Sequence, residues 1–221
     1  IKEYDIKMDE EITIIDSNAR NERIKNFFIN NKKKLILTVS IILVVIIGYL
    51  SFEKSKERTK IKLANQYNLA LIDLNPDNKQ KTINEMINIV KSNDITYSPL
   101  ALYHLLDNNL LENNEEINIL FNELIEKTNL ENEIKNLIIY KKALFNSDLV
   151  NENELLKILN PVINSESIWK SHALYLLAEY FYSKDEKQKA KEFFNQILFL
   201  PNANNAIKTE SQKRLNRDLG E

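Results

Sequence analysis

Apolar side chains recur along most of the chain with a period close to 36 residues. The pattern starts each time from a tyrosine, and the four tyrosines are 36, 37 and 35 residues apart. An apolar residue follows each tyrosine after three positions, another after 18 or 19, and a third comes three residues later. In chain order the sets are Tyr67, Ala70, Met86 and Ile89; Tyr103, Leu106, Phe121 and Leu124; Tyr140, Ala143, Leu159 and Val162; and Tyr175, Ala178, Phe194 and Ile197. Two helical stripes that repeat at this interval indicate stacked helix pairs, so we predict an all-α fold.

The fourth repeat has the clearest pattern. A first helix is predicted over 171–181, a turn over 183–186 and a second helix over 188–200, which Pro201 ends. This unit resembles a tetratricopeptide repeat, although Pro201 comes one residue early. The residues at that family's packing positions are Leu174, Leu177, Ala178, Phe181, Ala190, Phe194 and Ile197. The other three units are degenerate, with departures at Thr82, Asn109, Ile117 and Leu155.

Four such pairs are expected to fill residues 63–201, at about 63–92, 99–128, 134–165 and 170–201. Residues 202–221 are interpreted as a C-terminal capping segment, with its helix over 206–219. The basic side chains of this helix, Lys208, Lys213, Arg214 and Arg217, are expected to form its polar outer face.

Residues 35–52 are 18 consecutive residues without a charge, which at 1.5 Å per residue reach about 27 Å. About a dozen Leu, Ile, Val and Phe side chains in this stretch favour membrane insertion by several kcal/mol. A buried core helix would need an apolar partner surface, which the rest of the chain does not supply. A cleaved signal peptide would need a small-residue cleavage site, and none follows the apolar stretch. We therefore predict a single transmembrane helix.

Basic residues lie close to the predicted span on both sides. Residues 1–34 form a polar and acidic segment in which we expect little fixed structure before residue 21 and a short amphipathic helix over 21–31. Residues 53–62 form a basic juxtamembrane stalk, which no Gly or Pro separates from the first helix of the array. Residues 20–34 before the span contain six basic residues and residues 53–62 after it contain five, which leaves the orientation open.

The first helix of each pair lines the concave face of tetratricopeptide arrays, and this resemblance gives candidate partner-binding residues. They are Tyr67 and Leu71 in the first unit; Leu100, Tyr103, Asp107 and Leu110 in the second; Leu137, Tyr140 and Leu144 in the third; and His172, Tyr175, Glu179 and Tyr182 in the fourth. The four tyrosines either bind a partner or only pack between adjacent helices. The apolar content of this face favours extended or unfolded polypeptide as the ligand.

Composition gives no support for catalysis. The chain has no cysteine, so zinc thiolate sites and thiol nucleophiles are excluded, and its two histidines, His104 and His172, lack metal-ligand spacing. With two glycines there is no phosphate loop or nucleophile elbow. The net charge of −2 and the absence of a basic stripe with aromatic residues argue against nucleic acid. We predict a protein that is not an enzyme, without catalytic, cofactor or metal sites.

The whole chain resembles the bacterial ancillary SecYEG translocon subunit (YfgM-like) family. The resemblance rests on an acidic and then basic lead, on Gly48-Tyr49 at the end of the span, and on Ile168-Trp169 before the best repeat. The turn at 183–188 and the end at 213–219 are similar too. It implies a single-pass protein of the bacterial inner membrane, with a cytoplasmic N-terminus and a periplasmic array. It also implies, as partners, the SecYEG translocon and a membrane-anchored periplasmic chaperone, with which the protein would receive emerging secretory chains.

Two other functions remain open on the sequence. The first is a scaffold for cell-envelope assembly or division complexes, whose partners would be folded proteins. The second is an enzyme or a regulatory subunit of one, which would need a metal or a pocket of converging carboxylates. A cytosolic array anchored by its N-terminus is also consistent with the charges around the span.

Overall fold

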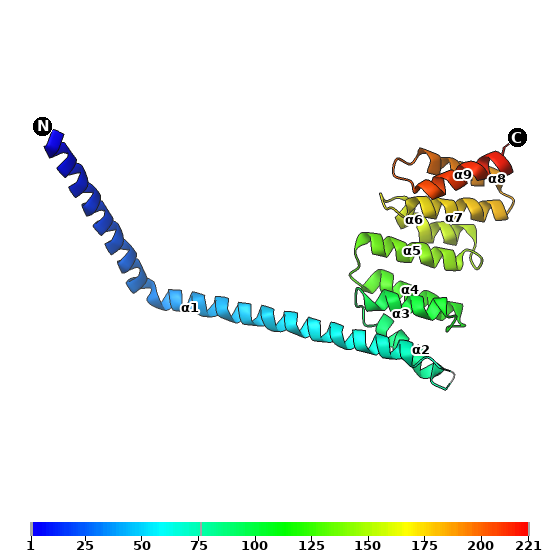
Figure 1. Ribbon diagram of the computed structural model, residues 1–221, viewed down its shortest axis with the longest axis horizontal. Helices are drawn as coiled ribbons and strands as arrows, with labels where there is room; N and C mark the ends of the chain where they lie inside the picture. The colour runs from blue at the N-terminus through cyan, green and yellow to red at the C-terminus, as the bar shows by residue number, and fades with distance from the viewer. Residues whose placement is uncertain (1, 76, 221) are drawn as a thin grey trace. The chain divides into compact units, whose positions relative to one another are not determined.

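The computed structural model describes residues 2–75 and 77–220, which contain nine α-helices and no β-strand (Figure 1). The prediction of an all-α fold is therefore confirmed for the described residues. The chain divides into two compact units, one that ends at Thr59 and one that begins at Lys60.

The first unit is the greater part of helix α1 (Lys2–Ile72). Nearly every side chain between Arg20 and Thr59 is exposed, including the apolar ones of residues 36–52. This helix is long and apolar enough to cross a membrane. The backbone is helical from Lys2, so the expectation of little fixed structure before residue 21 was wrong. Residues 21–31 belong to the same helix and are not a separate element.

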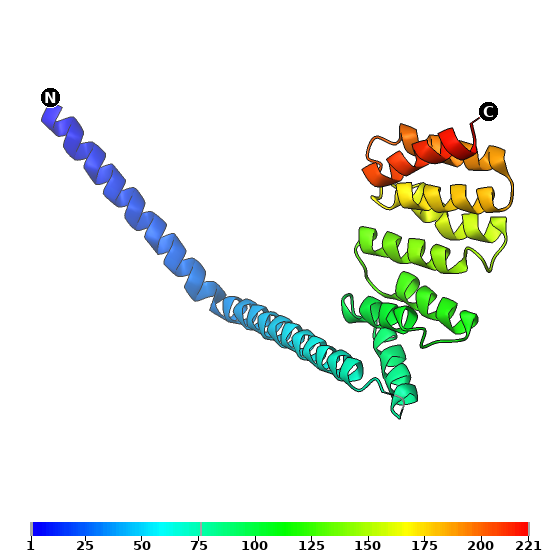
Figure 2. The same cartoon turned by 45° about the vertical axis from the view of Figure 1, so that its right-hand side comes forward.

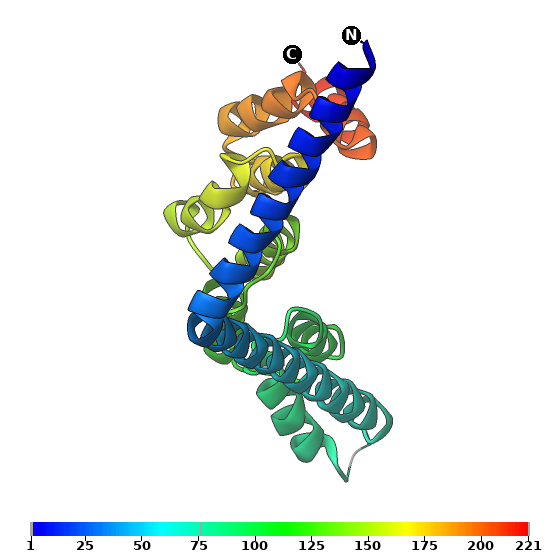
Figure 3. The same cartoon turned by 90° about the vertical axis from the view of Figure 1, so that its left-hand side faces the viewer.

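The second unit contains the end of α1 and eight shorter helices, which follow one another in a stack (Figure 2). The helices are α2 (Lys79–Val90), α3 (Tyr97–Asp107), α4 (Asn114–Lys127), α5 (Asn132–Asn146), α6 (Glu152–Ile163), α7 (Lys170–Ser183), α8 (Lys187–Phe199) and α9 (Asn205–Asp218). Figure 3 shows them from the side. The most extensive contact is between α7 and α8, followed by the contacts of α2 with α3 and of α5 with α6. Helix α3, however, makes a broader contact with α2 than with α4.

Asparagine and aspartate take the place of glycine where two helices end. The residue after the C-cap is Asn109 at the end of α3 (φ 49°) and Asp185 at the end of α7 (φ 60°). At the end of α7, Asp185 N donates to Tyr182 O at 3.0 Å and Glu186 N donates to Phe181 O at 2.9 Å, the two hydrogen bonds of a Schellman motif. These short polar residues tolerate the left-handed conformation better than most side chains do.

Three helices begin at an asparagine whose side chain accepts hydrogen bonds from the first turn. Asn113 caps α4, Asn151 caps α6 and Asn204 caps α9. Such a cap is typically worth about 1 kcal/mol relative to alanine. Asparagine is frequent in this chain, and some of these asparagines therefore stabilise the ends of helices.

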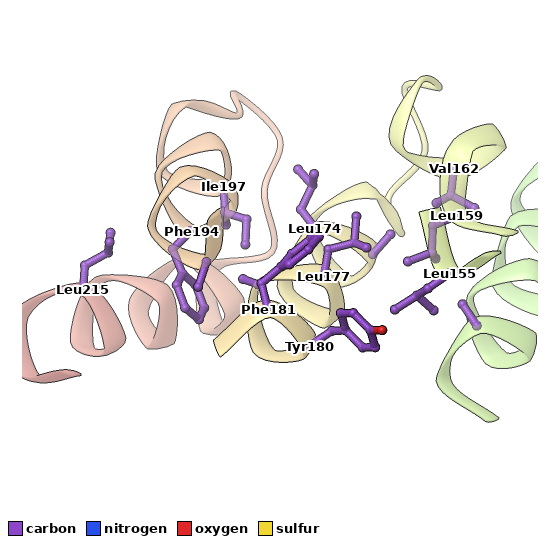
Figure 4. Close-up of a cluster of buried hydrophobic side chains, with 14 of the residues drawn as sticks. Leu155, Leu159, Val162, Leu174, Leu177, Tyr180, Phe181, Phe194, Ile197 and Leu215 are labelled. Atoms are coloured by element: carbon purple, nitrogen blue, oxygen red, sulfur yellow. The ribbon is translucent and has the colours of Figure 1, made fainter. Parts of the chain in front are cut away.

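The core of the second unit consists of two clusters of buried side chains. One includes residues between Leu63 and Ile138, and the other includes residues between Ile139 and Leu219. Figure 4 shows the second cluster, in which Phe181 and Phe194 are almost completely buried. All of the apolar positions that recur after the four tyrosines are buried except Leu106, which is half-buried. The repeat pattern therefore marks the core, as expected.

Candidate partner-binding surface

The four repeating tyrosines are all half-buried, and each has a different neighbour. The ring of Tyr67 lies 5.9 Å from that of Tyr97, and the ring of Tyr175 meets Phe194 edge-on at 5.5 Å. The other two are Tyr103, beside Lys141, and Tyr140, beside Trp169. Packing between helices is thus part of their role, and any binding role has to use the faces that remain exposed.

A cleft of about 380 Å³ lies between α3, α4 and α5 and brings three predicted residues together, namely Tyr103, Asp107 and Leu144. Lys141 Nζ lies 4.4 Å from the centre of the Tyr103 ring, a cation–π contact. The Tyr103 hydroxyl is buried and has no hydrogen-bond partner among the described residues. Leu144, by contrast, is 50% exposed. The cleft therefore offers an aromatic ring, a cation and an exposed leucine.

Burial raises the pKa of Tyr103 to about 12, and the nearby carboxylate of Asp107 acts in the same direction. The pKa of Tyr175 is also raised to about 12, first by burial and then by the carboxylate of Glu179. Both phenols therefore stay protonated at physiological pH.

Tyr140 and His172 meet in an aromatic cluster with Trp169, a residue that precedes α7. The rings of Tyr140 and Trp169 are stacked, with centres 6.0 Å apart, and the ring of His172 lies 5.9 Å from Tyr140 and 5.1 Å from Trp169. Burial lowers the pKa of His172, and the nearby backbone of Ile168 acts in the opposite direction. The imidazole is consequently neutral at pH 7, and the cluster joins α5 to α7.

Glu179 and Tyr182 contact the terminal helix α9 through one arginine. Arg214 donates from Nε and Nη2 to the two carboxylate oxygens of Glu179, both at 2.7 Å, and its guanidinium lies 4.2 Å from the centre of the Tyr182 ring. It also pairs with Asp218. The expectation that Arg214 lies on the outer face of α9 was wrong, because its side chain is only 14% exposed. Lys213 and Arg217 are exposed as expected.

The remaining predicted residues are leucines in different environments. Leu71 and Leu100 are exposed, and Leu137 is half-buried. Leu110 is buried in the core, so its prediction as a groove residue was wrong. The reason is the Schellman motif at the end of α3, where Leu110 N donates to Leu105 O at 2.9 Å. The residue at this position commonly packs its side chain on the last helical turn.

Three contributors to this surface were not among the predicted site residues, namely Lys141, Trp169 and Arg214. Each contacts the ring of a tyrosine on a different helix: Lys141 contacts Tyr103, Trp169 contacts Tyr140 and Arg214 contacts Tyr182. Trp169 carries a usable signal, since it is the only tryptophan and stands just before the best repeat. Lys141 and Arg214 carry no such signal in the sequence, because they resemble the many other lysines and arginines of the chain.

Comparisons with known proteins identify no relative: no family model, no curated protein and no solved structure matches the chain. Among the described residues, no three His, Asp or Glu side chains come together in a way that could hold a metal ion. The surface around Tyr103 is therefore the best-supported candidate site that the described residues provide.

Proposed function

We propose that this protein is a non-catalytic, membrane-anchored interaction protein that binds other polypeptides on the side of its helical domain that carries Tyr103 and Tyr140. The cleft between α3, α4 and α5 carries this proposal, because it combines Tyr103, Lys141 and the exposed Leu144. Aromatic rings with polar tips, beside exposed apolar groups, are common at protein-binding surfaces. Residues 35–52 would hold this surface next to a membrane.

The geometry of the helices supports a continuous binding face. Leu100, Tyr103 and Asp107 are spaced i, i+3 and i+7 on α3, and Leu137, Tyr140 and Leu144 have the same spacing on α5. Residues with this spacing lie on one face of a helix. Each helix thus presents a mixed apolar and polar stripe, which suits the alternating apolar side chains and polar backbone of a polypeptide.

We further propose that residues 63–201 are four degenerate tetratricopeptide-like helix pairs. The burial of the repeating apolar positions and the close packing of α5 on α6 and of α7 on α8 support this assignment. The first and second pairs are the least regular, because α2 makes a broader contact with α3 than with the end of α1, and α3 makes a broader contact with α2 than with α4.

The particular role that we propose is that of an accessory subunit of the Sec translocon in the bacterial inner membrane. The N-terminus would be cytoplasmic and the helical domain periplasmic, where the protein would handle secretory chains together with a membrane-anchored chaperone. The support is the sequence resemblance described above, together with the apolar helix α1 and the cleft at Tyr103.

Site-specific photocrosslinking in living cells tests the proposal. The photoreactive residue p-benzoylphenylalanine replaces Tyr103 or Leu144, with Ile119, an exposed residue of α4 outside this cleft, as the control position. Many products that include translocon subunits and newly made secretory chains are expected from the first two positions and not from Ile119. A single folded partner would favour a scaffold in envelope assembly. Equal products from all three positions would refute a specific surface.

A further inference from the structure

A second cleft of about 480 Å³ lies between α4 and α6, with α5 as its floor. Ile139, Lys142 and Asn146 of α5 line it, and each is two residues further along than Leu137, Tyr140 and Leu144, respectively. A shift of two residues turns a side chain by about 200° around a helix. The second cleft is therefore on the opposite side of α5 from the tyrosine stripe. Its volume is within the range of sites that hold small ligands or a few residues.

One wall of this cleft is a reciprocal pair of carboxamides. Asn118 Nδ2 donates to Asn146 Oδ1 at 3.0 Å, and Asn146 Nδ2 donates to Asn118 Oδ1 at 2.8 Å. The second N–H of each amide is also used, by the backbone oxygens of Asn114 and Lys142. Each side-chain oxygen has two lone pairs, of which one is used here. Asn146 is almost completely buried and Asn118 is half-buried, so the wall offers the oxygen of Asn118 as an acceptor for a peptide N–H.

Lys142 supplies a half-buried cation at the same cleft. Its Nζ donates to Asn122 Oδ1 at 2.7 Å, so this partner is a neutral oxygen. Burial lowers the pKa of Lys142, and the carboxylate of Glu126 opposes that shift. An ammonium group has three donors, and a charged acceptor binds it about twice as strongly as a neutral one. A ligand carboxylate would thus satisfy Lys142 better than Asn122 alone does.

The other groups of the cleft narrow the class of ligand. Its apolar surface includes Ile139 and Ile158, and its charged rim has two acidic residues, Glu126 and Glu154, against Lys142 and Lys157. The several negative charges of a polyphosphate or a nucleic acid would be repelled more strongly by the two carboxylates than the single carboxylate of a chain whose other polar groups are neutral amides.

We propose that this cleft binds an extended polypeptide segment that carries a carboxylate, with the carboxylate on Lys142 and a backbone N–H group on the oxygen of Asn118. This site would be additional to the tyrosine side of the domain. The proposal for this cleft does not depend on which partner binds the tyrosine side.

Two pools of random hexapeptides test the inference by fluorescence polarisation against the full chain in phosphatidylcholine nanodiscs. Each peptide has an N-terminal fluorescein and a C-terminal amide, with Asp and Glu excluded from the random positions. The fourth position is Glu in one pool and Gln in the other. We expect the Glu pool to bind about tenfold more tightly, and Lys142→Met to reduce this preference to less than about twofold.

Lys135→Met is the matched control, because Lys135 is on the same helix α5 but lines neither this cleft nor the cleft at Tyr103. This variant should keep the full preference for the Glu pool. Crosslinking of the Glu pool from p-benzoylphenylalanine in place of the exposed Lys157, at the rim of the cleft, tests the location without changing Lys142. Products from this position are expected.

Three results would overturn the inference. They are equal binding of the two pools, a preference that survives Lys142→Met, and no product from position 157. A preference kept in Lys142→Met but lost in Lys141→Met, which changes the cleft at Tyr103, would also overturn it. That last result would place the peptide on the tyrosine side and so leave the proposed function intact.

Discussion

Replacement of Phe194 by alanine tests whether the repeating apolar positions hold the helical domain together. The Phe194 side chain is completely buried between the helices of the second core cluster, and its ring meets Tyr175 at 5.5 Å. Loss of the buried ring costs about 1.5–3 kcal/mol in transfer free energy, and the cavity that remains adds to this. We expect the free energy of unfolding to fall by about 3–5 kcal/mol.

The matched control is Phe199→Ala, because the same substitution on the same helix removes a ring that is 84% exposed. This change should alter the free energy of unfolding by less than about 0.5 kcal/mol. For a domain of this size, 3–5 kcal/mol corresponds to a decrease of roughly 6–20 °C in Tm.

Urea unfolding of the full chain in mild detergent measures both variants, followed by the fluorescence of Trp169. This residue is the only tryptophan and stacks on Tyr140, so its emission reports on the packing between α5 and α7. The reasoning would be refuted if Phe194→Ala cost less than about 1 kcal/mol, or if the two variants were equally destabilised.

Three further predictions concern pH, the terminal helix and the membrane. Because the pKa of His172 is lowered in the folded state, the unfolded chain binds more protons than the folded chain below about pH 6.5, and the free energy of unfolding should fall from pH 7 to pH 5. In urea titrations at both pH values, His172→Gln should reduce that fall. Arg214→Met should destabilise the docking of α9 by about 1–3 kcal/mol and speed amide hydrogen exchange over residues 205–218, whereas Lys213→Met should leave the exchange unchanged. Val44→Arg should oppose insertion of α1 by about 3–4 kcal/mol and lower the fraction that resists alkaline carbonate extraction, whereas Val44→Leu should not.

Much of the fold could be predicted because the core positions repeat. Ala143 and Ala178 are small where helices approach closely, and Phe121 and Phe194 fill the space between helices, so the sequence carries the same signal several times. The second helix of the last pair, predicted over 188–200, lies at Lys187–Phe199. Local stop signals, here Pro201, were sufficient to place its end.

Helix ends without glycine were harder to predict. Asn109 looks like a departure from the repeat, yet it adopts the left-handed conformation that ends α3, and this places Leu110 in the core. Asparagine occurs so often in this chain that one asparagine at a helix end does not stand out from the others. The groove prediction at Leu110 failed for that reason.

The candidate site depends on contacts between distant parts of the chain. Arg214 reaches Glu179 across 35 positions and Lys142 reaches Asn122 across 20, and no local pattern indicates either pairing. The periodicity predicted which face of a helix carries the tyrosines. It could not predict which cation or ring of a neighbouring helix lies against each of them.

Cysteine labelling across the membrane tests the central claim, a helical domain held at a bilayer by α1, most directly. The chain has no cysteine, so Asn26→Cys and Asn153→Cys each introduce a single thiol, at exposed positions on the two sides of residues 35–52. A membrane-impermeant maleimide added to intact spheroplasts should label position 153 at once and position 26 only after permeabilisation. Labelling of both positions to the same extent in intact spheroplasts, or of neither, would contradict a span between them.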